Sequence, residues 1–170
     1  MKHLLIIWHS RTGYSEHMAL ALAKGATHTA EALEQAHHLH VQCQTAHETT
    51  EEDLLRADGY LFCAPENLGT LSGEMKECFD RNYYAVLDQI QGKPYAIAIS
   101  AGTDGQGAAR QLERICTGWR LRSIAPALIE RNGAQSAEAI MANKVAPPDT
   151  LARCQEYGGL LAATLLAGEL

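Results

Sequence analysis

Short apolar runs alternate with helix-like stretches along nearly the whole chain, and this alternation strongly limits how it can fold. The first run, Leu4-Leu5-Ile6-Ile7-Trp8, is continuously apolar, as expected of a parallel strand that is covered on both faces. The other predicted strands span residues 38–44, 60–63, 95–99 and 123–129. The predicted helices span residues 15–35, 51–57, 72–89, 106–116 and 150–167. Five strand–helix units in succession predict an α/β protein with a parallel sheet and helices on both faces.

The succession of units also predicts a strand order and the position of a ligand site. Five such strands most often adopt the order 2-1-3-4-5 in a three-layer sandwich. Pro65 is expected to stop the third strand, and residues 132–148 are expected to be mostly loop. Ligands bind outside the carboxyl ends of parallel strands, at the point where the strand order reverses. The loops after the first, third and fourth strands are therefore the expected ligand site.

Composition limits the class of protein. A length of 170 residues is typical of one domain, and 46% hydrophobic with 20% charged residues argues against disorder. The net charge of -6 provides no basic excess for binding nucleic acid. The five cysteines form no C-x-x-C pair and fit free thiols in a reducing cytoplasm. Because the apolar stretches at 4–8 and 160–167 are too short for a signal-peptide core or a membrane span, we expect a cytoplasmic protein without membrane insertion.

The loop after the first strand, residues 10–15, has the chemistry of an anion site. Three hydroxyls and one glycine lead directly into a helix whose first amides and dipole favour negative charge. Gly13 would let the backbone turn tightly around an anion, and Ser10, Thr12 and Ser15 would donate to it. The alternative is a polar turn in which Ser15 only caps the helix. Neither G-x-x-x-x-G-K-[ST] nor G-x-G-x-x-G is present in this loop, which disfavours ATP and a Rossmann-bound dinucleotide.

The other two loops are rich in polar groups and glycine. Residues 65–73 mix apolar and polar side chains, and Ser72 is placed to cap the next helix. Residues 100–107 contain three glycines, which let the backbone approach a flat ligand closely. The alternative for this third loop is a flexible surface loop in which Asp104 starts the next helix.

Three motifs in order give the chain a resemblance to a known family. The first is S-x-T-G-x-S at 10–15, and the second is P-x-N-x-G-x-x-S-x-x-M-K at 65–76, followed by F-D-R at 79–81. The third is the glycine-rich loop at 100–107. The set resembles flavodoxin-like FMN proteins, and the second motif resembles their NAD(P)H-dependent FMN and quinone reductase branch. The Phe-x-Asp-Arg ending of that branch is one residue shorter here.

The resemblance implies a flavodoxin-like fold over residues 1–170 and assigns each loop a part of an FMN cofactor. The phosphate would be bound by the first loop, in which an arginine can offset its charge: Ser10, Arg11, Thr12, Gly13, Tyr14 and Ser15. One side of the isoalloxazine ring would be lined by Pro65, Glu66, Asn67, Leu68, Gly69 and Thr70. The pyrimidine edge would be held through backbone N–H groups by Ser100, Ala101, Gly102, Thr103 and Gly105. No side-chain acid or base and no metal is assigned, because the cofactor carries the chemistry.

The resemblance also implies an activity. It indicates an oxidoreductase that passes electrons from NAD(P)H through FMN to a quinone, a flavin or another small acceptor. One alternative is a flavodoxin-type electron carrier, and another is a flavodoxin-like scaffold that no longer binds flavin. Carriers typically present a strongly acidic face, so the net charge of -6 favours the enzyme. Relatives in the reductase branch imply a homodimer or a tetramer.

The second and third loops depart from the family because they contain no aromatic residue. Members commonly have an aromatic residue where Asn67 stands, and flavodoxins often hold the ring between aromatic side chains. One explanation is an open flavin face that a nicotinamide or quinone can reach. The other is weak flavin binding, since stacking contributes about 0.5–1.5 kcal/mol beyond burial.

Two other patterns favour different functions less strongly. Cys116, Arg122 and Ser123 match the C-x5-R-S pattern of phosphatases, but this cysteine falls near the end of a predicted helix, where the dipole disfavours a thiolate. A histidine-rich patch could bind a metal weakly, although a solvated edge strand is the simpler explanation. Its members are His37, His38, His40 and His47.

Overall fold

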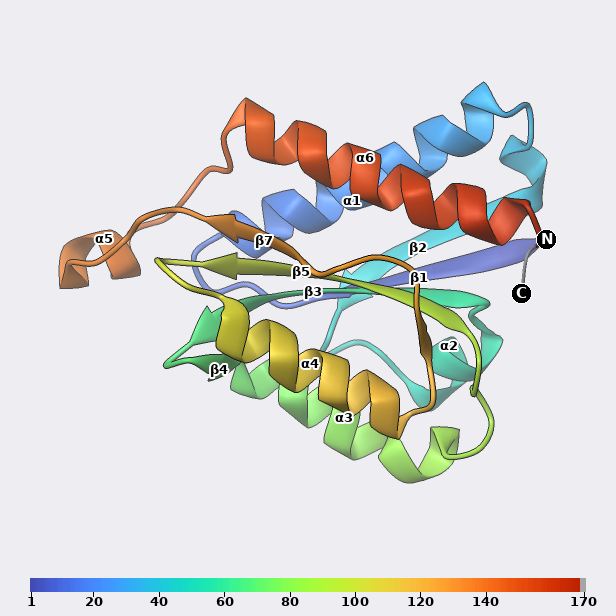
Figure 1. Cartoon of the computed structure of the whole chain (residues 1–170), viewed down its shortest axis with the longest axis horizontal. Helices are drawn as coiled ribbons and strands as arrows, with labels where there is room; N and C mark the ends of the chain where they lie inside the picture. Colours follow the sequence, from blue (N-terminus) through green and yellow to red (C-terminus); the bar gives the residue numbers. More distant parts are fainter. Residues whose placement is uncertain (169–170) are drawn as a thin grey trace.

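The computed structural model describes residues 1–168, so the last two residues of the expected 1–170 domain lie outside the described part. Strands and helices alternate along the chain (Figure 1). The strands are β1 (Lys2–Trp8), β2 (Leu39–Thr45), β3 (Gly59–Asn67), β4 (Thr70–Leu71), β5 (Pro94–Ala101), β6 (Arg122–Ser123) and β7 (Leu128–Arg131). The helices are α1 (Tyr14–Ala32), α2 (Glu51–Arg56), α3 (Gly73–Val86), α4 (Gln106–Gly118), α5 (Ala137–Met141) and α6 (Pro148–Leu166), with a 3-10 turn, η1 (Ala36–His38).

The sheet places the first and third strands of the chain side by side. The described strands follow the order β2-β1-β3-β5-β6, all parallel, and β7 pairs with β5 further along the same edge. The short β4 forms an antiparallel hairpin with β3. With the hairpin set aside and β6 and β7 taken as two parts of the last strand, the predicted order 2-1-3-4-5 is confirmed.

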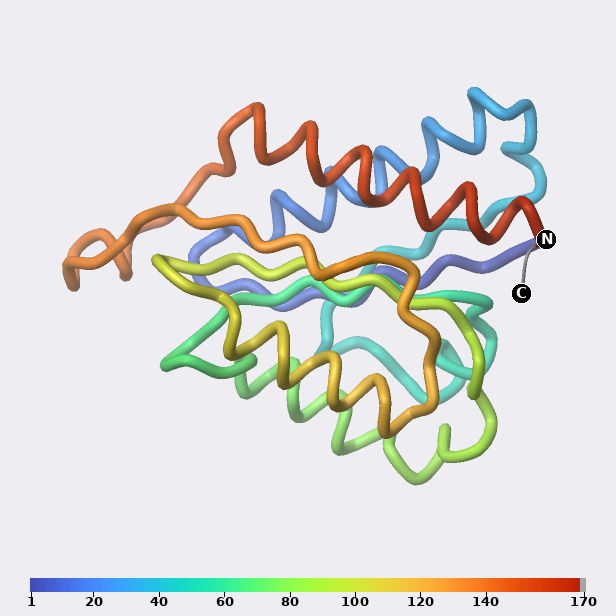
Figure 2. The backbone as a smooth tube through the Cα atoms, in the orientation of Figure 1, coloured from blue at the N-terminus to red at the C-terminus, as the bar shows by residue number. Residues whose placement is uncertain are grey.

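Helices cover both faces of the sheet, which gives three layers (Figures 1 and 2). α1 and α6 lie on one face, and α2, α3 and α4 lie on the other. Each face has its own apolar core: Leu4 and Ile6 of β1 pack toward α1 and α6, whereas Leu5 and Ile7 pack toward the other helices. Successive side chains of a strand alternate between faces, so a strand covered on both faces needs both sets. This explains why β1 is a continuous apolar run.

α1 and α6 approach each other backbone to backbone. A Cβ on Gly25 would lie 1.9 Å from the Gln155 carbonyl oxygen, and a Cβ on Gly158 would lie 2.0 Å from the Leu22 carbonyl oxygen. Only glycine fits at these two positions, because any side chain would overlap the backbone of the facing helix. The close pairing holds the start of α6 over α1, near the carboxyl ends of the strands (Figure 1).

Two stretches differ from the expectation. β3 does not stop at Pro65: its parallel pairing with β5 ends there, but the chain stays extended to Asn67 as one arm of the hairpin with β4. The strand predicted at 123–129 is two short strands instead, separated by a segment in which Pro126 has no N–H to donate. Residues 132–148 are mostly loop, as expected, and include the five-residue helix α5, which projects beyond the carboxyl ends of β5 and β7 (Figure 1).

Candidate functional site

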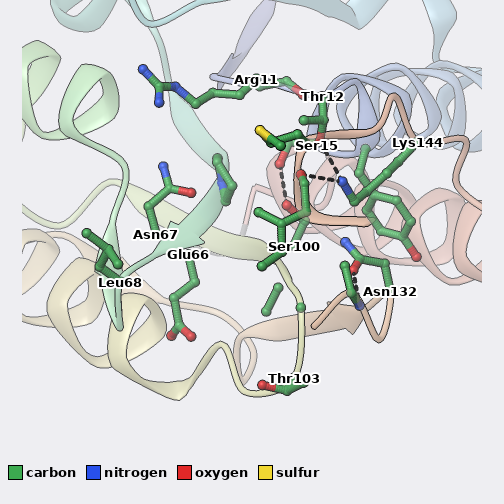
Figure 3. A pocket seen from close by; sticks show the side chains of 18 residues that line it. Arg11, Thr12, Ser15, Glu66, Asn67, Leu68, Ser100, Thr103, Asn132 and Lys144 are labelled. Atoms are coloured by element: carbon green, nitrogen blue, oxygen red, sulfur yellow. Dashed lines mark hydrogen bonds between the residues drawn. The ribbon is translucent and has the colours of Figure 1, made fainter. Parts of the chain in front are cut away.

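A cavity of about 620 Å3 opens at the carboxyl ends of β1, β3 and β5, where the strand order reverses (Figure 3). Small-molecule sites typically have volumes of about 300–1,000 Å3. All three predicted loops contribute to its wall. The predicted residues that line it are Ser10, Arg11, Thr12, Tyr14, Ser15, Pro65, Glu66, Asn67, Leu68, Ser100, Ala101, Gly102 and Thr103.

Four predicted residues do not line the cavity: Gly13, Gly69, Thr70 and Gly105. Gly13 and Gly105 are the N-cap residues of α1 and α4, and Gly69 and Thr70 belong to the hairpin turn between β3 and β4. Sequence reasoning missed five lining residues: Asn132, Ala134, Ile140, Met141 and Lys144. All five belong to the connection between β7 and α6. That stretch has no long periodic pattern, so nothing in its sequence places it against this edge of the sheet.

The first loop directs the start of α1 toward the cavity. Gly13 is the N-cap residue and has a φ of 99°, a left-handed conformation that glycine adopts without strain. Because Gly13 has no side chain to cap the helix, the first amides of α1 are left for another acceptor. The Ser10 hydroxyl accepts from the Gly13 N–H at 3.0 Å and orders the turn. The loop thus combines a helix N-terminus with hydroxyl groups, as an anion site requires.

Ser15 does not cap α1 with its side chain. It lies in the first turn, 1% exposed, and its Oγ is 2.6 Å from the Oγ of Ser100. This buried hydrogen bond joins the first loop to the third loop. Both serines line the cavity, so a ligand there meets a coupled pair of hydroxyls (Figure 3).

Tyr14 directs its hydroxyl into the protein rather than toward the first loop. Its side chain is buried, and its Oη lies 3.2 Å from Thr150 Oγ1 of α6. Thr150 donates to the Glu130 carboxylate at 2.9 Å, and Arg153 donates to the same carboxylate at 2.6 and 2.8 Å. The hydrogen bonds from Arg153 are the main reason that the pKa of Glu130 is lowered. This network ties the start of α1 to β7 and α6.

Arg11 lies at the rim of the cavity and is turned toward α3. Its guanidinium is 3.3 Å from the Glu74 carboxylate, and Figure 3 shows it pointing away from Lys144. His9 lies 3.7 Å from Glu74, and its Nδ1 is 2.9 Å from Ser72 Oγ. Burial lowers the pKa of His9 and Arg11 adds to this, although Glu74 opposes it. Ser72 is the N-cap residue of α3 as expected, but its hydroxyl bonds the histidine instead of the helix backbone.

The second loop is held in place through its own glutamate. The Glu66 carboxylate accepts from the Gly105 N–H at 2.9 Å and from the Ala108 N–H at 3.1 Å, at the start of α4. Gln111 of α4 accepts from the Leu71 N–H at 2.7 Å. Figure 3 shows the Glu66 carboxylate directed away from the first loop. Its charge therefore caps α4 and couples the second loop to the third.

Lys144 belongs to the connection between β7 and α6 and lies beside the first loop in the wall of the cavity (Figure 3). Its backbone N–H donates to the Thr12 carbonyl at 2.7 Å. Its Nζ lies 3.4 Å from Thr12 Oγ1 and donates to the carbonyls of Ile140 and Ala142 at 2.8 and 2.9 Å. An ammonium group thus lies beside a hydroxyl of the predicted phosphate loop.

The two competing patterns gain no support from the geometry. Cys116 is fully buried in the last turns of α4, and burial raises the pKa of its thiol well above the usual range. The His40 ring packs against the His3 ring, with centroids 5.2 Å apart. Within residues 1–168, no group of three or more His, Cys, Asp or Glu side chains is placed to hold a metal ion.

A loop with the groups of an anion site and two further loops, all at the reversal point of a 2-1-3-4-5 sheet, are typical of the class of flavodoxin-like FMN proteins. The chain belongs to the NADPH-dependent FMN reductase family, whose sequence model matches residues 9–134. The matched region contains all three cavity loops. The family predicted from the motifs is confirmed, and with it FMN as the cofactor.

One curated relative is named a flavodoxin, and another is named an NAD(P)H dehydrogenase (quinone). A flavodoxin of Aquifex aeolicus is 35% identical over 107 residues, which cover 63% of this chain and 54% of the relative. An NAD(P)H dehydrogenase (quinone) of Acidithiobacillus ferrooxidans is 30% identical over 124 residues, which cover 63% of this chain and 60% of the relative. The chain thus spans little more than half the length of these curated relatives. A solved flavodoxin from the domain Archaea shares the fold, with a TM-score of 0.74 at 16% identity over 96% of this chain and 98% of that one.

The groups around the cavity fit the two ends of FMN. The hydroxyls of Ser10 and Thr12, the first amides of α1 and the ammonium of Lys144 suit a phosphate, because all of them can donate hydrogen bonds to it. The second and third loops add small and apolar groups, such as Pro65 and Ala101, that suit a flat ring.

Proposed function

We propose that the chain is an FMN-dependent oxidoreductase that passes electrons from NAD(P)H to a quinone, a flavin or another small acceptor. The observation that carries this proposal is the family match, which runs through all three cavity loops. The relative named NAD(P)H dehydrogenase (quinone) supports the same electron donor and a quinone as one class of acceptor.

In this proposal the first loop holds the phosphate of the cofactor, and the other two loops hold its ring. Ser10, Thr12 and the first amides of α1 bind the phosphate, and residues 65–68 and 100–103 line the ring. When bound, FMN supplies the redox chemistry, and the protein supplies position and surroundings. Two interactions fix the positions of the three loops relative to one another before a ligand binds: the hydrogen bond between Ser15 and Ser100 and the capping of α4 by Glu66.

The cavity wall favours a reductase over a carrier. Among the described residues that line the cavity, Tyr14 is the only aromatic one, and its side chain is 4% exposed. A flavin ring would therefore lie without a stacking aromatic side chain across it. We infer that a nicotinamide or an acceptor reaches the open face of the ring.

A flavodoxin-type electron carrier is the second candidate, because a flavodoxin is 35% identical to this chain. A carrier passes electrons between protein partners and oxidises no nicotinamide by itself. The two functions are separated by mixing FMN-loaded protein with NADH or NADPH without oxygen and recording the visible spectrum of the flavin. Rapid bleaching supports the reductase. A flavin that stays oxidised with both nucleotides but is reduced by dithionite supports the carrier, and protein that binds no FMN would contradict both.

We also propose that the protein is cytoplasmic, that residues 1–170 form one domain, and that it assembles as a homodimer or tetramer. Over residues 1–168, no helix is long and apolar enough to cross a membrane. All five cysteines are free thiols, which fits a reducing compartment. Size-exclusion chromatography with light scattering measures the mass of the assembly, and a monomer at micromolar concentration would contradict the proposed oligomer.

A further inference from the structure

The phosphate end of the cavity has to balance a negative charge. A phosphate monoester carries about 1.5 to 2 negative charges at neutral pH, and charged donors bind it more strongly than neutral hydroxyls do. The first loop contains one cation, Arg11, but its side chain is 67% exposed and its guanidinium lies 3.3 Å from the Glu74 carboxylate. The charge of Arg11 is therefore already matched by a carboxylate at the rim.

Lys144 brings a second cation to this end of the cavity (Figure 3). Its ammonium contacts Thr12 Oγ1 at 3.4 Å and the carbonyls of Ile140 and Ala142 at 2.8 and 2.9 Å. These three acceptors are neutral oxygens. The positive charge thus remains available to a ligand in the cavity.

The backbone holds Lys144 in this position at three points. The Lys144 N–H donates to the Thr12 carbonyl at 2.7 Å, and the Ala146 N–H donates to His17 Nδ1 at 3.2 Å. A Cβ built on Gly13 would lie 3.1 Å from the Lys144 carbonyl oxygen, so the two segments are in close contact. The lysine is therefore positioned before a ligand binds, which reduces the ordering cost of binding.

We propose that Lys144 neutralises the phosphate of FMN and makes the protein select a flavin phosphate over riboflavin. An ammonium has three protons to donate, and the contact with Thr12 is the longest of its three. A phosphate oxygen replaces this contact, while the carbonyls of Ile140 and Ala142 keep the ammonium in place. The inference rests on the proposed FMN-dependent function and adds a specificity-determining residue to it.

The test compares the affinities of FMN and riboflavin for the wild type, Lys144→Met and Lys144→Arg, each measured by quenching of flavin fluorescence. Lys24→Met is the matched control, because Lys24 is exposed on α1 and does not line the cavity. We expect Lys144→Met to weaken FMN by about 10- to 100-fold and riboflavin by less than about twofold. Lys144→Arg keeps the charge and retains most of the preference for FMN, and Lys24→Met changes neither affinity. Added salt weakens FMN binding more in the wild type than in Lys144→Met.

Two results would overturn the inference while leaving the proposed function intact. Equal losses for both flavins would mean that Lys144 supports the segment rather than the phosphate. An unchanged FMN affinity in Lys144→Met would mean that the charge is not used.

If the wild type binds neither flavin, inorganic phosphate is titrated against the amide NMR signals of residues 12–15. Shifts that Lys144→Met abolishes would support the lysine site and contradict the flavin function. The absence of shifts in the wild type would contradict both.

Discussion

Thr12 lies where the first loop, the start of α1 and the connection to α6 meet. Its carbonyl accepts from the Lys144 N–H, its hydroxyl is 3.4 Å from Lys144 Nζ, and its side chain lines the cavity. The next residue, Gly13, is the N-cap residue of α1. Ligand affinity and backbone geometry are therefore controlled by neighbouring residues, and single substitutions can separate them.

Replacing the Thr12 hydroxyl tests its contact with the phosphate. We expect Thr12→Val to weaken FMN binding by about 1.5–3 kcal/mol, the usual value of a hydrogen bond to a charged group, with little change in stability. Fluorescence titration with FMN measures the effect. Thr70→Val is the control, because the Thr70 hydroxyl bonds the Asn67 carbonyl outside the cavity wall. Equal affinities for Thr12→Val and the wild type would remove Thr12 from the phosphate site.

A methyl group at Gly13 tests the backbone of the first loop. Gly13→Ala is expected to lower the free energy of unfolding by about 1–3 kcal/mol, because alanine is strained at a φ of 99° and its Cβ would lie 3.1 Å from the Lys144 carbonyl oxygen. Gly73 is the matched control at the start of α3, where a Cβ meets nothing within 4 Å. Urea denaturation measures the stability of Gly13→Ala and of the control Gly73→Ala. If Gly13→Ala is no less stable than Gly73→Ala, the first loop tolerates a side chain at residue 13 and the expected strain is absent.

At the scale of elements, the ends of strands and helices are coupled across the sheet. Glu66 lies near the end of β3 but caps α4, and Ser15 lies in the first turn of α1 but bonds Ser100 near the end of β5. Each loop is therefore ordered by an element that it does not directly connect. This arrangement keeps three separate loops at one common site. A ligand with two chemically different ends needs such a site, because each end requires its own binding groups.

The coupling by Glu66 predicts a loss of stability. Glu66→Ala leaves the N–H groups of Gly105 and Ala108 without their carboxylate, and we expect the free energy of unfolding to fall by about 1–3 kcal/mol. FMN affinity should fall as well, because the second and third loops lose their common anchor. Chemical denaturation and FMN titration measure the two effects. Glu113→Ala changes an exposed residue of α4 and should alter neither stability nor FMN affinity. A Glu66→Ala protein as stable as this control would disprove the capping role.

Sequence patterns predict these elements best where one physical reason decides the structure. The run Leu4 to Trp8 is apolar because both of its faces are covered, so β1 and its central place follow from periodicity. The prediction that Pro65 stops the third strand was wrong, because the proline ends only the parallel pairing with β5 and the chain remains extended in a hairpin with β4. Lys144 could not be predicted, because its place depends on how α6 packs on α1, which brings a distant and aperiodic segment to the first loop. The hydroxyls of the first loop could be predicted, since they follow a strand and precede a helix in sequence.

At the scale of the whole molecule, one buried polar network crosses from the sheet to the helices that cover it. Glu130 lies on β7, Thr150 and Arg153 lie on α6, and Tyr14 lies at the start of α1. The Glu130 side chain is only 7% exposed, so its charge depends on Arg153 and Thr150 rather than on water. The network therefore links the stability of the fold to the position of the first loop.

This network predicts how stability depends on pH. Arg153 is the main cause that lowers the pKa of Glu130 below its ordinary value of 4.5. A carboxyl group whose pKa is lower in the folded than in the unfolded state stabilises the fold above the unfolded value, and this contribution is lost as the pH falls through the folded value. The wild type should therefore lose more stability than Glu130→Gln on acidification from pH 6 to about 3. Glu130→Gln should be the less stable protein at neutral pH, because Arg153 then lacks its carboxylate partner.

Urea denaturation of both proteins at several pH values measures the difference. Glu138→Gln on α5 is the control, because this exposed glutamate lies outside the network, and it should follow the wild-type curve. The free energies of unfolding of Glu130→Gln and the wild type could instead change by the same amount between neutral and acidic pH. In that case Glu130 would not be a group whose protonation destabilises the fold. If the two free energies converge toward acid, FMN affinity measured over the same range should fall together with the stability that Glu130 contributes, because Tyr14 connects the network to the first loop.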